Sequence, residues 1–128
     1  MSRRKIIHIF GNPLLDFDNL PLKLVPKLQK IFPKISFVIA DPSENLKPIG
    51  GELIIIDTIE GVKGVTLIDN LDQIKIEKIY SLHDFDLAFN LKLLQKIGKL
   101  KKIKIIGVPM EISKQEALRQ IYVELNRI

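Results

Sequence analysis

The chain has 128 residues, which is enough for one packed domain and too few for two. Its apolar content of 46% argues against disorder, and its lack of cysteine excludes disulfides, thiolate catalysis and cysteine-ligated zinc. The net charge of +5 comes with 6% aromatic residues and no Trp, so it does not predict nucleic-acid binding. No apolar run approaches the ~20 residues needed to cross a bilayer, and we expect a cytoplasmic protein without membrane insertion.

The first third of the chain predicts a strand, a helix and a second strand. Residues 5–10 are almost continuously apolar, which favours a central strand covered on both faces. Residues 19–31 have apolar positions at helical spacing, and Pro26 inside this stretch predicts a kink or an early break. Residues 35–40 form the second predicted strand.

The middle of the chain predicts strands separated by loops. Residues 41–50 are a predicted loop. The very apolar residues 53–56 are a predicted strand, which we expect to end at Asp57. Residues 65–68 form a short strand at an edge, where it can pair antiparallel. Residues 74–80 alternate apolar and charged side chains, which indicates a half-exposed strand.

The last third predicts two helices around one more strand. Residues 84–97 have a helical apolar pattern, and Gly98 follows as a C-cap. Residues 103–108 are the last strand. Ser113 followed by Glu116 forms a capping box that starts the final helix.

The alternation of strands and helices predicts the fold class. Such alternation is typical of βαβ units and of a mostly parallel sheet. We therefore expect an α/β protein with a three-layer, mostly parallel twisted sheet, helices on both faces and one short antiparallel or edge strand. Residues 1–128 form a single domain, expected to be a monomer, and the enrichment in Lys and Glu without Cys is compatible with a thermophilic source.

Polar residues follow most of the predicted strands. If the main strands are parallel, these residues share the carboxyl edge of the sheet, where open α/β sheets bind ligands. The simpler alternative is that loops are polar and that Asp caps helices. The residues are Gly11, Asn12, Asp16, Asp18, Asp41, Asp57, His83 and Glu111.

Two motifs lie in the first half of the chain. Gly11 and Asn12 follow the first strand and lead to the acidic residues Asp16 and Asp18. The second motif is the apolar strand that ends in Asp57.

Two further motifs lie in the second half. His83 stands at the head of a predicted helix, and the last strand closes with Gly107, Val108, Pro109 and then Glu111. In this order, the four motifs resemble those of the hydrogenase maturation endopeptidases. That family removes the C-terminal extension of the large-subunit precursor of nickel-iron hydrogenases, so the resemblance implies a hydrolase whose partner is this precursor.

The resemblance also implies a metal site. Asp18, Asp57 and His83 correspond to the family's metal ligands, through which any catalysis runs. By the same resemblance the expected metal is nickel supplied by the substrate, and zinc or cadmium could substitute for it. Residues that would contact these ligands or the substrate are Gly11, Asn12, Asp16, Asp41 and Glu111.

The sequence departs from the family pattern in two segments. Phe17 separates Asp16 from Asp18, whereas the family has two adjacent acidic residues. Pro42 follows Asp41, whereas the family has glycines at this place. These departures motivate an alternative function, a non-catalytic assembly or quality-control factor that reads the metal on the same fold.

Two other features have separate interpretations. His8 lies inside the first strand and is expected to be a hydrogen-bonded core or interface residue, not a ligand. A cluster of lysines is interpreted as a solvated end of the sheet and, secondarily, as a docking surface for an acidic partner. The cluster comprises Lys96, Lys99, Lys101, Lys102 and Lys104.

Overall fold

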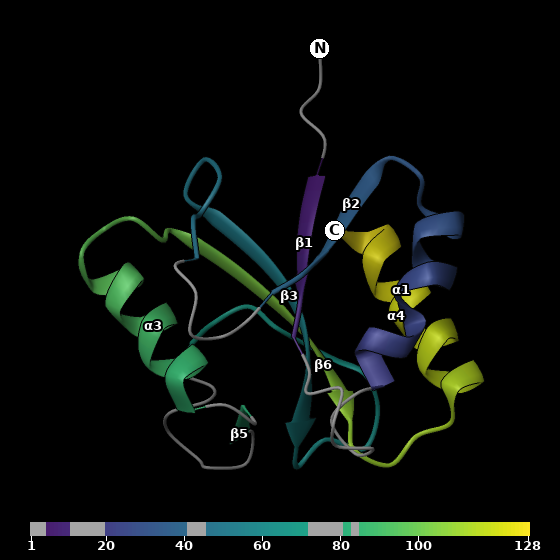
Figure 1. Cartoon of the computed structure of the whole chain (residues 1–128). Coiled ribbons are helices and arrows are strands. Elements are labelled where there is room, and N and C mark those ends of the chain that lie inside the picture. Colours follow the sequence, from purple (N-terminus) through teal and green to yellow (C-terminus); the bar gives the residue numbers. More distant parts are fainter. Residues whose placement is uncertain (1–4, 11–19, 41–45, 72–80, 83–84) are drawn as a thin grey trace.

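The computed structural model describes residues 5–10, 20–40, 46–71, 81–82 and 85–128 (Figure 1). Strands and helices alternate along most of these segments, as the apolar pattern predicts. The elements are β1 (Lys5–Ile9), α1 (Leu20–Ile31), β2 (Ile35–Ile39), β3 (Glu52–Glu60), β4 (Thr66–Ile68), β5 (Ser81–Leu82), α3 (Phe85–Lys96), β6 (Lys102–Pro109) and α4 (Lys114–Arg127). The predicted strand over residues 74–80 lies outside the described residues.

The sheet has the strand order β2-β1-β3-β6-β4, and β5 pairs with β3 off this path. β1 is parallel to both β2 and β3, and β3 is parallel to β6. β4 pairs antiparallel with β6 at the edge of the sheet, so the prediction of one short antiparallel edge strand is confirmed.

Helices cover both faces of this sheet, which gives the predicted three layers (Figure 1). Successive side chains of a strand point to opposite faces, and β3 shows this directly. Ile54 and Ile56 pack in a cluster with apolar residues of α1 and α4. Ile55 and Ile59 pack in a second cluster, which includes Leu91 of α3. The α/β fold class is therefore as the sequence predicts.

Of the two effects predicted for Pro26, a kink or an early break of the helix, the early break does not occur in α1. Pro26 lies inside the helix, which continues to Ile31. A proline removes one backbone donor, and the carbonyl that loses this donor must find another partner. Pro26 is on the exposed side of α1, where water can solvate that carbonyl. The helix therefore tolerates the proline.

The two later helices have the expected end signals. Gly98 adopts a positive φ of 81° just after α3, a conformation that glycine reaches without strain. At the start of α4, the Ser113 hydroxyl accepts a hydrogen bond of 3.1 Å from the Glu116 N–H. Within the described part of the chain, no helix is long and apolar enough to cross a membrane.

Candidate functional site

The parallel strands bring their carboxyl ends to one edge of the sheet. Ile9 at the end of β1 is in register with Ile56 of β3, and the Phe10 N–H donates to the Ile56 carbonyl at 3.0 Å. On the other side of β3, Asp57 is in register with Gly107 of β6. Asp57 therefore lies where the end of β1 and the Gly-Val segment of β6 meet β3.

Asp57 is inside a strand, and the prediction that the strand ends there is wrong. β3 continues to Glu60, because its backbone keeps pairing with β6 as far as the pair Ile59 and Pro109. The side chain of Asp57 is only 2% exposed. Its Oδ1 accepts a hydrogen bond of 2.9 Å from the Thr58 N–H, which orients the carboxylate.

The strand alternation assigns Asp57 and Thr58 to opposite faces. Asp57 shares the face of Ile55 and Ile59, which is the side covered by α3. Thr58 is 1% exposed and shares the face covered by α1 and α4. Its hydroxyl is buried and has no hydrogen-bond partner among the described residues.

Gly107 has a steric role that the motif comparison did not identify. A Cβ at this position would lie 2.4 Å from Cδ1 of Ile59, far inside van der Waals contact. The Ile59 side chain thus packs across the backbone of Gly107, the residue of β6 that is in register with Asp57. A glycine inside an apolar strand is a known sign of close approach, so this signal was present in the sequence.

A cavity of about 530 Å³ lies beyond Asp57 at the ends of β3 and β6. Glu111, one of the expected site residues, lines it and is exposed. The opposite charge comes from Lys63, which the sequence analysis did not identify as a site residue. The remaining lining residues are Ile59, Gly61, Val62, Pro109 and Met110.

The short strand β5 brings a distant segment to this region. Leu82 is in antiparallel register with Ile59, and Ser81 with Glu60. Leu82 is directly followed in the chain by His83. The pairing therefore brings Leu82, which precedes the expected ligand His83 in the sequence, to the strand next to β3. Its partner there is Ile59, two residues past Asp57.

The other expected site residues lie outside the described residues. These are Gly11, Asn12, Asp16, Asp18, Asp41 and His83. Within the described ranges, no three His, Cys, Asp or Glu side chains are grouped to hold a metal ion. Of the three expected ligands, the structure therefore describes Asp57 alone.

His8 lies away from this edge, in a cavity of about 170 Å³ near the amino ends of the strands. Burial lowers the pKa of its imidazole below the usual value. Its Nδ1 is buried and has no hydrogen-bond partner in the part of the chain that the structure describes. The expected hydrogen bond is therefore not found at this atom.

No protein-family model and no curated protein matches the chain. Among solved structures, the chain is similar to an uncharacterized protein from Wolinella succinogenes, at 16% sequence identity and a TM-score of 0.51. The match covers 98% of this chain and 94% of that protein. At this level of identity the likeness shows a shared fold.

Proposed function

We propose that the protein is a metal-dependent endopeptidase of the hydrogenase maturation type. Its substrate is the nickel-loaded large-subunit precursor of a nickel-iron hydrogenase, from which it removes the C-terminal extension. The observation that carries the proposal is the strand order β1-β3-β6. β3 contains Asp57, β6 contains Gly107, and Gly11 and Asn12 come soon after β1 in the sequence, so three of the four resembling motifs lie in or shortly after adjacent parallel strands.

The proposal assigns substrate recognition to Asp18, Asp57 and His83, which bind the nickel that the precursor carries. One imidazole and two carboxylates suit Ni(II), which when bound supplies a Lewis acid for the scissile carbonyl or for water. Asp57 fits this role because a carboxyl group that is 2% exposed has lost most of its contact with water, and a bound cation would favour its charged form. The hydrogen bond from Thr58 to Asp57 holds the carboxylate in one orientation.

The cavity beyond β3 supports the substrate side of the proposal. Its volume of about 530 Å³ gives room for part of an extended peptide at the ends of β3 and β6. Lys63 and Glu111 on its lining offer one cation and one anion to such a peptide.

Incubation with a nickel-loaded precursor, followed by intact-mass measurement of the precursor, tests the proposal. We expect the wild-type chain to shorten the precursor and Asp57→Asn to leave it full-length. Asp69→Asn is the matched control, because Asp69 is an exposed carboxylate just after β4, and it should cleave normally. A precursor that the wild-type chain leaves intact would exclude the endopeptidase.

A precursor that binds but stays full-length would instead assign the chain to the non-catalytic assembly or quality-control factor. The departures from the family pattern at Phe17 and Pro42 motivate this alternative.

A further inference from the structure

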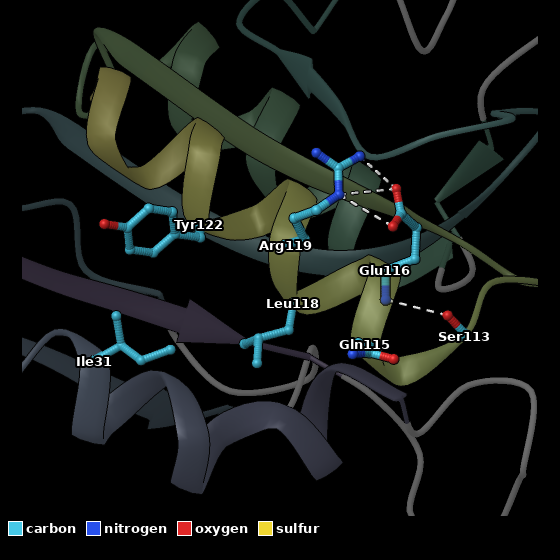
Figure 2. Close-up of a pocket in the computed structure, with 7 residues that line it drawn as sticks. All are labelled: Ile31, Ser113, Gln115, Glu116, Leu118, Arg119 and Tyr122. Carbon is cyan, nitrogen blue, oxygen red and sulfur yellow. Dashed lines mark hydrogen bonds and ion pairs between the residues drawn. The ribbon is translucent and has the colours of Figure 1, made fainter.

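Helices α1 and α4 lie side by side on one face of the sheet, and a groove of about 500 Å³ runs along α4 and is bordered on the α1 side by Ile31 (Figure 2). Ile31, Leu118 and Tyr122 form its apolar part. Ile31 is 41% exposed and Tyr122 is 45% exposed, so the groove presents apolar surface to solvent. Gln115, Glu116 and Arg119 line its polar side on α4.

The two helices that form the groove are fixed to the sheet by side-chain amides. Gln29 of α1 donates to the Ile35 carbonyl at 2.7 Å, which fixes the end of α1 to β2. Gln120 of α4 accepts from the Val65 N–H at 2.7 Å, which fixes α4 to the segment before β4. The groove is therefore preformed, and a ligand would not have to bear the cost of ordering it.

The charged residues of α1, which borders the groove, are all lysines. α1 contains no acidic residue, and Lys23 and Lys27 precede Ile31 by about two turns and one turn on the same ridge of the helix. Among the described residues, neither lysine has an ion-pair partner.

The two acids of α4 are already paired. Glu116 pairs with Arg119, whose Nε donates to both of its carboxylate oxygens at 3.1 Å, and Glu124 pairs with Arg127 at 3.5 Å. Hydrogen bonds from Arg119 and then Gln120 lower the pKa of Glu116 to about 2, so this carboxylate stays ionised and paired at neutral pH. Within the described part of these two helices, both acids of α4 therefore have a partner, whereas Lys23 and Lys27 of α1 do not.

We propose that this groove docks an amphipathic helix of a partner protein, with apolar residues on the buried face of that helix and Asp or Glu along its flanks. A helix suits the site because a groove between two neighbouring helices accepts a third at the usual interaxial distance of about 8–10 Å. Acidic flanks complement Lys23 and Lys27. A second copy of this chain is disfavoured, because a symmetric dimer through this face would bring the lysine ridges of both copies together. None of the groove residues belongs to the candidate peptidase site, so the two proposals are independent.

Two synthetic helical peptides test the proposal by fluorescence polarisation. Both carry Leu at positions i, i+3, i+4 and i+7, and their flanking positions are Glu in one peptide and Lys in the other. We expect the Glu peptide to bind and the Lys peptide not to bind, and binding should weaken as salt increases. Tyr122→Asp should weaken binding roughly tenfold or more, since an aromatic anchor in the groove is lost. Val123→Asp is the matched control, because Val123 is an apolar residue of α4 with 39% exposure that does not line the groove.

Equal binding of the two peptides, no binding of either, or equal losses in Tyr122→Asp and Val123→Asp would overturn the proposal. Light scattering adds a separate test. A wild-type dimer that Tyr122→Asp converts to monomer would assign the groove to a second copy and would also overturn it. Circular dichroism melts confirm beforehand that the variants are folded.

Discussion

At the scale of single residues, His8 shows how burial changes the contribution of an ionisable side chain. Its pKa is lowered by burial, so the folded protein favours the neutral imidazole. As the pH falls through about 6.5, the unfolded chain takes up a proton that the folded chain does not. The unfolded state then binds more protons, and the free energy of unfolding decreases.

We therefore expect the free energy of unfolding, measured by urea denaturation, to decline between about pH 7 and pH 5, above the range in which most carboxylates titrate. His8→Gln should reduce this decline, because the glutamine does not titrate. His83→Gln serves as the control, since the chain has 2 histidines in total, and it should keep the His8 component. An unchanged pH dependence in His8→Gln would show that His8 titrates equally in both states.

At the scale of elements, the length of β3 depends on its partner. In the sequence, Asp57 follows the four apolar residues 53–56, which indicated that the strand ends there. In the structure, β6 pairs with β3 beyond Asp57, as far as the pair Ile59 and Pro109. The tertiary partner therefore overrode the local pattern. The packing of Ile59 across Gly107 belongs to the same pair of strands and likewise needs both to be in place.

The contact between Gly107 and Ile59 predicts a coupled pair of substitutions. Gly107→Ala should lower the free energy of unfolding by about 1–3 kcal/mol, because the new Cβ displaces the Ile59 side chain. Ile59→Val removes Cδ1, the atom that the Cβ would approach most closely, so the double variant should lose less stability than the sum of the single ones. Urea denaturation of all four proteins measures this coupling.

A control for this coupling comes from Ile103, which lies four residues earlier in β6 and is buried. At the usual rise of ~3.4 Å per strand residue, it is too far from Gly107 to share the contact. Ile103→Val combined with Gly107→Ala should therefore be additive. Additivity in the Ile59 pair as well would contradict the steric explanation of Gly107.

At the scale of the whole molecule, the sequence predicts features with local causes. The cap at Ser113, the left-handed Gly98 and the antiparallel strand that ends at Ile68 each follow from a short pattern, and the structure confirms them. Alternation of apolar segments also predicts the layered fold. The persistence of α1 past Pro26 and the burial of Asp57 depend on solvent exposure and on neighbouring strands, which a single sequence does not specify.

The candidate site is predictable to a smaller extent. The resemblance of motifs identifies the candidate metal ligands and their expected neighbours. The parallel strand order then explains why Asp57 and the end of β6 share one edge of the sheet. The cavity with Lys63 was not predicted, because its wall forms only when the turn after β3 meets the loop after β6.

The whole fold also bears on whether any metal is structural, and we expect the chain to fold without one. Fully buried Ile and Leu side chains fill both faces of the sheet, and each contributes roughly 1.5–3 kcal/mol. Asp57 itself lies in a strand whose pairing continues beyond it, so its backbone is held without a metal. Structural metals are needed mainly by domains too small to build such a core.

Chelator should therefore leave the circular dichroism and the melting temperature unchanged, while added nickel should raise the melting temperature by mass action if the site binds it. Asp57→Asn should melt like the wild-type protein without metal, because the amide oxygen can still accept the hydrogen bond from Thr58, but it should lose the rise with nickel. Asp69→Asn, which changes an exposed carboxylate, should keep that rise. If chelator alone unfolds the protein, the metal supports the fold, and a role in reading nickel on a substrate loses its physical basis.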